Sequence, residues 1–199
     1  NFLIELVDAS GKVLLPLVML DSNMYGEGGW FFSGFDRIHE DQVDWCTERL
    51  NALKQEYPNI KAMAFFHMPP REFKEAYEKM KLGDGNVIYR HGSIAENDEY
   101  FGISKLKSTF FDRAAENGVI KWIFCGHDHL NTLYLVYKGI QMTYGMSVDY
   151  LGYKDIKKSY IQRGGTLITR SADGNVDIAM VPIGSVVSTR VRGVREHII

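Results

Sequence analysis

The sequence has few of the features that mark several common classes of protein. Its two cysteines, Cys46 and Cys125, form no recognisable disulfide framework. A structural zinc site usually takes four ligands with cysteine among them, and neither cysteine is placed for such a site. It contains no Asn-x-Ser/Thr sequence, and its longest apolar runs are far shorter than the ~20 residues that span a membrane. No initiator methionine or targeting segment precedes Asn1, so we expect a piece of a longer protein.

Common catalytic signatures are also missing. A serine hydrolase would carry Gly-x-Ser-x-Gly, and nucleotide-binding enzymes would carry Gly-x-Gly-x-x-Gly or a P-loop, none of which occurs. Ser104-x-x-Lys107 has the spacing of penicillin-binding enzymes without their companion motifs, so we interpret it as a solvated helix start. The formal net charge of -2 argues against nucleic acid or an anionic membrane as the main partner.

The chain does contain a regular series of apolar segments. Its 199 residues, 45% of them hydrophobic, predict one domain with a sizeable core. Strands are predicted at residues 2–7, 13–20, 61–66, 119–124, 132–137, 140–144, 165–170 and 176–181. Helices between the earlier strands predict an α/β (α+β) fold, and the later strands form hairpins.

The clearest helix is predicted over residues 41–57. Asp41 is the expected N-cap, and Pro58 ends the helix. The apolar residues recur at alternating steps of three and four, which places them in one stripe: Val43, Cys46, Leu50, Leu53 and Tyr57.

Periodicity weakens over residues 71–104, which we interpret as an insertion or lid, with a short charged surface helix at 71–81. Helical spacing returns over residues 104–117, where Gly118 is the stop. We assign residues 1–183 to one domain and residues 184–199 to a weakly patterned tail.

Two of the predicted strands end at histidine. The run to Phe124 ends in Gly126-His127-Asp128-His129, and the run to Phe66 ends at His67 before Met-Pro-Pro. Side chains two apart in extended backbone share a face, and ligands collect at the carboxyl ends of strands in α/β sheets. Imidazole is the commonest metal ligand near neutral pH, so we predict that these three histidines bind metal. The alternative is that His127 and His129 are two loop histidines whose hydrogen bonds are satisfied within the protein.

The remaining histidines and one aromatic loop are weaker candidates. His39, before the first helix, and His197, in the tail, are expected to be solvated. His91 is a candidate for contact with a substrate. Tyr25 is a second such candidate, because it lies in a glycine-rich loop that follows a buried strand.

These residues carry a resemblance to a known family. Gly126-His127-Asp128-His129 resembles the last block of the calcineurin-like metallophosphoesterases, and Phe66-His67-Met68-Pro69 resembles the block before it. Further similarity, to the purple-acid-phosphatase-like branch, lies in Leu20-Asp21-Ser22-Asn23, in Gln42-x-x-Trp45, and in Tyr144-Gly145 with Arg163-Gly164-Gly165. The resemblance extends from Asn1 to about Pro182.

The resemblance implies a phosphatase that hydrolyses a phosphorylated substrate at a binuclear metal centre on a β-sandwich flanked by helices. By resemblance, His67 and His127 bind one metal ion and His129 the other, the ions being divalent or trivalent iron, manganese or zinc. The earlier family blocks, Asp-x-His, Gly-Asp-x-x-Asp and Gly-Asn-His-Asp/Glu, are absent here. Three imidazoles cannot hold two such ions without carboxylates.

We therefore interpret the chain as the C-terminal half of such an enzyme, and its expected partner is the missing N-terminal half. The alternative is a non-catalytic fragment or interaction module that keeps the fold and binds metal weakly or not at all.

Overall fold

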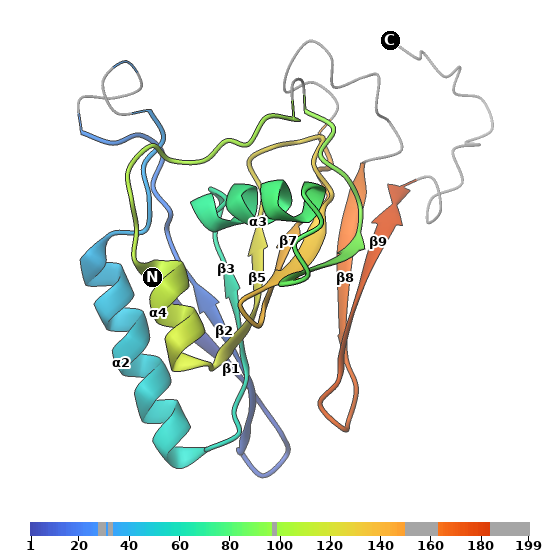
Figure 1. Cartoon of the computed structure of the whole chain (residues 1–199). Coiled ribbons are helices and arrows are strands. Elements are labelled where there is room, and N and C mark those ends of the chain that lie inside the picture. The colour runs from blue at the N-terminus through green and yellow to red at the C-terminus, as the bar shows by residue number, and fades with distance from the viewer. Residues whose placement is uncertain (28–30, 32–33, 97–98, 150–162, 184–199) are drawn as a thin grey trace, which may run out of the picture.

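The computed structural model describes residues 1–27, 31, 34–96, 99–149 and 163–183. A seven-stranded sheet has the order β1-β2-β3-β5-β7-β6-β4, and a separate pair is formed by β8 and β9 (Figure 1). The strands are β1 (Phe2–Val7), β2 (Val13–Met19), β3 (Ala62–Phe65), β4 (Val87–His91), β5 (Ile120–Cys125), β6 (Tyr134–Tyr137), β7 (Ile140–Tyr144), β8 (Gly164–Arg170) and β9 (Val176–Pro182). The helices are α2 (Glu40–Glu56), α3 (Arg71–Lys81) and α4 (Phe110–Asn117).

The centre of the large sheet is parallel. β2 pairs with β3, β3 with β5, and β5 with β7, all in parallel, whereas β1, β6 and β4 are antiparallel to their neighbours. Five strands, β2, β3, β5, β7 and β4, therefore present their carboxyl ends at one edge, since β4 and β7 are both antiparallel to β6. In such a sheet this edge is the expected place for a ligand.

Helices cover one face of the sheet (Figure 1). The predicted stripe of α2 is confirmed at Val43, Cys46, Leu50 and Leu53, which are buried, whereas Tyr57 is the half-buried C-cap after the helix ends at Glu56. The helix begins one residue earlier than predicted, and its N-cap is His39 rather than Asp41. The Gln42 side chain accepts a hydrogen bond from the His39 backbone N–H at 2.8 Å, which is one half of a capping box.

The opposite face is covered by the β8–β9 hairpin. Ile178 of β9 packs with Leu15, Met63 and Phe124 of the large sheet. The mixed α/β architecture with strands layered on a helix-backed sheet agrees with the predicted fold class. Strand β1 extends this face to the edge of the sheet, where Phe2 is 56% exposed. Ile4 and Leu6 are exposed beside it.

The segment 71–104 is more regular than predicted. Its short helix is confirmed as α3, which buries Phe73 and Ala76. Strand β4 was not predicted; it pairs with β6 and forms an edge of the large sheet, so this part is integral to the fold. The role of the segment as a lid stays a prediction.

The helix predicted over 104–117 is wrong at its start, since α4 covers only Phe110–Asn117. Residues 104–109 are held instead by side chains: Ser104 and Ser108 donate hydrogen bonds to the carbonyl groups of Phe35 and Ile38. Ser104 is buried, which corrects its interpretation as solvated. Gly118 ends α4 with φ 76°, as predicted.

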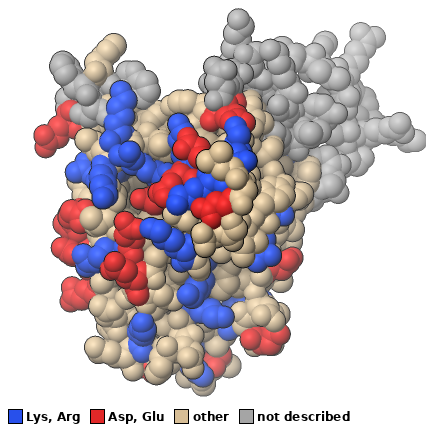
Figure 2. Space-filling view, in the orientation of Figure 1, with Lys and Arg blue, Asp and Glu red and all other residues tan. Residues whose placement is uncertain are grey.

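The surface over the helices carries mixed charge. Figure 2 shows Lys and Arg interspersed with Asp and Glu on this face. Arg113 of α4 pairs with Asp44 of α2, and Lys79 pairs with Glu75 within α3. This face therefore has no broad field of one sign. None of the helices in the described ranges is both long and apolar enough to span a bilayer. The predicted tail, with His197, lies outside those ranges.

Candidate metal centre

The carboxyl ends of β3 and β5 bring two of the predicted histidines together. The strands pair as far as Phe65 and Phe124, and the contact continues beyond them, where the Gly126 N–H donates to the His67 carbonyl at 3.0 Å. The Met68 N–H donates to the buried Ser22 hydroxyl at 2.8 Å, which ties the end of β3 to the loop after β2. His67 and His127 therefore follow adjacent, fixed strand ends.

The two rings face each other at close range. His127 Nδ1 lies 3.3 Å from His67 Nε2, and the rings are nearly perpendicular at 88°. His127 has a φ of 71°, an uncommon backbone conformation for a residue other than glycine. Partial burial lowers the pKa of both imidazoles, with neighbouring histidines adding to the effect, and the pKa of His127 falls to about 4. Both rings are therefore neutral at pH 7, the state in which imidazole binds a metal.

His129 belongs to the same edge but has a different partner. Its Nδ1 lies 2.9 Å from an Asp149 carboxylate oxygen, on the loop that follows β7. A positive charge on its ring would lower the pKa of His67 and of His127, so the three imidazoles lie close enough to affect one another.

A buried carboxylate beneath the pair was missed by the sequence analysis. Asp128 is 5% exposed and accepts hydrogen bonds from the Tyr144 hydroxyl at 2.6 Å and from the Gly102 N–H at 3.0 Å. Burial raises the pKa of Asp128 to about 6. The sequence feature that could have identified it is its position between the two histidines, just after a buried strand, where a side chain is often enclosed by the protein.

Asn131 was missed as well. It is fully buried, and its side chain accepts hydrogen bonds from the N–H groups of Ala95 and Glu96 and donates one to the Tyr100 carbonyl. Together with Asp128 it holds residues 95–96 and 100–102 against the histidine-bearing loop.

An aromatic wall adjoins the histidine pair. Phe35 contacts the His127 ring edge-on with centroids 4.4 Å apart, and Tyr25 stacks on Phe35 at 6.2 Å. Tyr25 is therefore beside the predicted site and is 47% exposed. Of the glycine-rich loop that contains it, Gly28, Gly29 and Trp30 lie outside the described residues.

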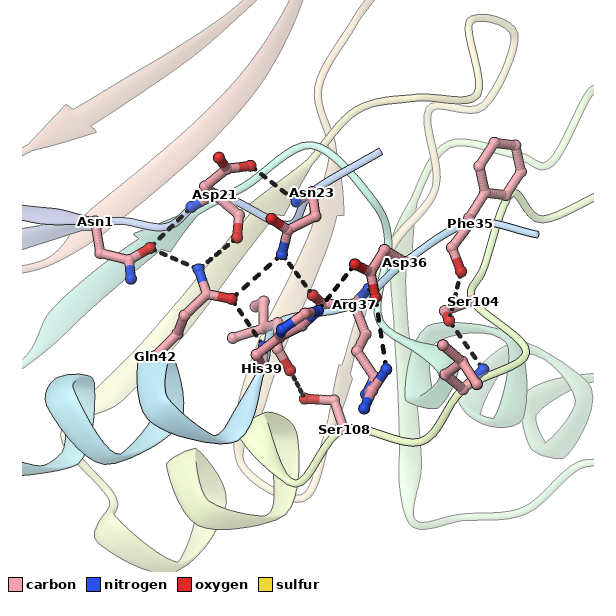
Figure 3. A network of polar contacts seen from close by, with 12 residues as sticks. Asn1, Asp21, Asn23, Phe35, Asp36, Arg37, His39, Gln42, Ser104 and Ser108 are labelled. Carbon is pink, nitrogen blue, oxygen red and sulfur yellow. Dashed lines mark hydrogen bonds and ion pairs between the residues drawn. The ribbon is translucent and has the colours of Figure 1, made fainter. Parts of the chain in front are cut away.

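A polar network fixes the strand-to-helix connection that carries this wall (Figure 3). The Gln42 amide nitrogen donates to the Asp21 carbonyl at 2.7 Å and to the Asn1 side chain at 2.9 Å. His39 lies 2.9 Å from the Asp36 carboxylate, so it is not simply solvated. His39 is thus part of the framework around the helix start.

His91 is placed less favourably. It lies exposed at the end of β4, where its ring contacts Tyr134 at 5.8 Å. Within the described part of the chain, no contact joins it to the three other histidines, and its role with a substrate stays a prediction.

The geometry of the pair can be compared with the needs of a metal ion. Two nitrogens bound at about 2.0–2.1 Å in tetrahedral geometry lie roughly 3.3–3.4 Å apart. The 3.3 Å between His127 Nδ1 and His67 Nε2 fits this spacing. Across the described residues, however, no three His, Cys, Asp or Glu side chains form a group that could hold an ion. The pair thus fits part of one coordination sphere, without the carboxylates of a complete binuclear centre.

Comparison with known proteins identifies relatives of the chain. It is 29% identical over 150 residues to "Probable inactive purple acid phosphatase 29" of Arabidopsis thaliana, a match that covers 71% of this chain and 36% of that protein. It is 23% identical over 153 residues to "Probable inactive purple acid phosphatase 14" of the same plant, covering 73% and 35%. It is 30% identical over 118 residues to "Phosphatase DCR2" of Saccharomyces cerevisiae, covering 58% and 19%. No protein-family model and no solved structure matches the chain.

The chain spans about a third of the length of the two Arabidopsis proteins that it matches. The resemblance predicted from its histidine blocks is confirmed by these relatives.

Proposed function

We propose that this chain is the histidine-bearing part of a metal-dependent phosphatase that acts on phosphate esters, because it is related to the purple-acid-phosphatase-like proteins. The observation that carries the proposal is the pair of facing nitrogens on His67 and His127, 3.3 Å apart at the carboxyl edge of the parallel strands. This spacing supports one shared ion, and His129 is the proposed ligand of a second. Imidazole suits iron and zinc, whereas manganese prefers carboxylate and other oxygen ligands.

Each group of this chain has a proposed task. His67, His127 and His129 offer neutral nitrogen donors. Asp128 holds the backbone of the histidine loop through Gly102 and Tyr144, and thereby fixes the direction of His127. When bound, a pair of metal ions polarises a phosphoryl oxygen and lowers the pKa of water near neutrality.

The aromatic wall of Tyr25 and Phe35 is the proposed contact for the leaving group of the ester. It lies directly beside His127, and a ring there excludes water from one side of the site. His91 is kept as a more distant candidate for contact with the substrate.

The carboxylates of the centre are proposed to come from a further polypeptide region, which is the partner expected from the sequence. Hard divalent and trivalent ions require oxygen ligands that the three histidines do not provide. The exposed apolar residues of β1, Phe2, Ile4 and Leu6, support the same proposal, since a covering layer would bury them.

A second candidate is a non-catalytic domain that keeps the fold. It is favoured by the word "inactive" in the printed names of the Arabidopsis relatives. The two candidates differ in one respect: a catalytic domain hydrolyses a phosphate ester and requires the histidines for it, whereas a non-catalytic domain shows no turnover.

The experiment that tests the proposal combines this chain with a polypeptide region that carries Asp-x-His, Gly-Asp-x-x-Asp and Gly-Asn-His, supplied in the same chain or as a second one. Hydrolysis of p-nitrophenyl phosphate is measured with excess manganese or zinc for the unmodified protein and for His129→Ala and His39→Ala. We expect His129→Ala to abolish turnover, since losing one ligand removes several kcal/mol of barrier lowering. His39→Ala, which removes no proposed metal ligand, should retain turnover. Near-native turnover by His129→Ala at metal saturation would contradict the proposed role of the histidines, and absence of turnover in the unmodified protein would favour the non-catalytic candidate.

A further inference from the structure

The contact between His129 and Asp149 joins two loops that are 20 residues apart in the sequence. His129 Nδ1 lies 2.9 Å from Asp149 Oδ2, and both side chains are about one-third exposed, at 32% and 29%. A contact of this length is a full hydrogen bond rather than a loose ion pair.

The Asp149 backbone is held in place from two sides. Its N–H donates to the Ser147 hydroxyl at 3.1 Å, and its carbonyl accepts a hydrogen bond from Arg163 Nε at 2.8 Å. Arg163 is 1% exposed and forms a parallel bridge with Ser147, while the Gly164 N–H donates to the Ser147 carbonyl at 3.0 Å. The loop after β7 is therefore attached to the start of β8, and the carboxylate is presented to the imidazole from a fixed backbone.

A neutral imidazole has two tautomers, and a hydrogen bond selects between them. A carboxylate accepts but does not donate when ionised, so Asp149 requires the proton to be on Nδ1 of His129. The lone pair of the neutral ring is then on Nε2. Without such a partner, neutral histidine in water favours the opposite tautomer, with the proton on Nε2.

The two histidines of the Gly-His-Asp-His block thereby use different nitrogens. His127 directs Nδ1 towards His67 Nε2, whereas His129 has its Nδ1 engaged by Asp149. Two imidazoles that are separated by a single residue can in this way present lone pairs from opposite ring positions. A partner on the far side of a ligating imidazole also fixes its orientation and raises its basicity.

We propose that Asp149 is a positioning residue that holds His129 in the Nδ1–H tautomer and so assigns Nε2 as its donor atom. The statement about the tautomer stands on the contact alone. The consequence for metal binding rests on the proposed function.

The test is nitrogen NMR of the histidine rings in the uniformly ¹⁵N-labelled, metal-free 199-residue chain at about pH 8, which is well above the value of about 6.5 for a model imidazole. Ring resonances are assigned with a His129→Gln variant. We expect a protonated Nδ1 and an unprotonated Nε2 in His129. In Asp149→Ala the ring should shift towards the Nε2–H form, and Asp149→Asn, whose carbonyl oxygen can still accept, should retain the Nδ1–H form. Asp84→Ala, which removes a carboxylate from an exposed turn, is the matched control and should leave His129 unchanged.

The outcomes separate this inference from the proposed function. An Nε2–H tautomer in the unmodified chain, or an unchanged tautomer in Asp149→Ala, overturns the inference whatever the activity. In the complete phosphatase, Asp149→Ala should lower metal affinity by about 10–100-fold, the usual effect of losing such a partner. A shifted tautomer with unchanged metal affinity would leave Asp149 as a positioning residue and remove His129 from the metal centre.

Discussion

Replacing Gly102 by alanine should disturb the histidine pair directly. A Cβ at Gly102 would lie 2.0 Å from His127 Cδ2, 2.5 Å from its Nε2 and 2.7 Å from Asp128 Oδ1. Ordinary contact begins at 3.4 Å, so the imidazole would have to move by about 1.4 Å, from 2.0 to 3.4 Å. The φ angle of Gly102 is not in the positive region, so the expected effect is steric and not a matter of backbone strain. Overpacking of this kind costs about 1–3 kcal/mol of unfolding free energy.

The assay is urea unfolding followed by circular dichroism, with Gly85→Ala as the matched control. An alanine methyl group at Gly85 would meet nothing within 4 Å, and Gly85 has no positive φ, so its replacement should be neutral or stabilise by up to ~1 kcal/mol. The double variant Gly102→Ala/His127→Ala should recover part of the lost unfolding free energy, because the alanine methyl group clashes most closely with the His127 ring. Coupling energies between contacting residues are about 0.5–3 kcal/mol. Equal stability of the two alanine variants, with no coupling to His127, would refute the close packing of Gly102 beneath the imidazole.

Two further predictions concern the core and the pH dependence. Leu50→Ala, in the buried stripe of α2, should lower the unfolding free energy by about 2–5 kcal/mol. Leu82→Ala, at an 87% exposed position, is the control and should change it by less than about 0.5 kcal/mol. Unchanged urea midpoints for both variants would show that α2 does not pack against the sheet. In the metal-free chain, the lowered pKa of His127, about 4 against 6.5 when unfolded, should make stability fall as the pH drops through this window, because the unfolded chain binds more protons there. The raised pKa of Asp128, about 6 against 3.8 when unfolded, has the opposite effect, because the folded chain binds more protons in that window. Asp128→Asn should therefore steepen the loss of stability on acidification, and His127→Ala should flatten it, as measured by thermal melts from pH 7 to pH 4. The same dependence of melting temperature on pH in both variants and the unmodified chain would contradict both pKa shifts.

The sequence was most informative where one physical rule decides the local structure. The step of three and four along α2 predicted its buried stripe, and the turn at Lys138-Gly139 predicted the β6–β7 hairpin, whose two turn residues have positive φ values of 47° and 75°. His67 and His127 were expected to meet because parallel strands end at a common edge, and they do.

Other features depend on contacts between distant segments and have no local pattern. Strand β4 is exposed at four of its five residues, so it lacks the alternation that marks a strand, and it exists because β6 offers a free edge. The start of α4 is delayed by hydrogen bonds from Ser104 and Ser108 to a loop some 70 positions earlier in the chain. Asp149 is recognised as the partner of His129 only once β5 and β7 are known to be neighbours.

The most direct test of the account is the metal content of this chain by itself. The central claim is that the chain supplies three imidazole donors and that the carboxylates of a binuclear centre come from elsewhere. After saturation with zinc or manganese and exhaustive dialysis, elemental analysis should find weakly held metal at less than one ion per chain, lowered further by His67→Ala. Two tightly held ions per isolated chain would contradict the claim.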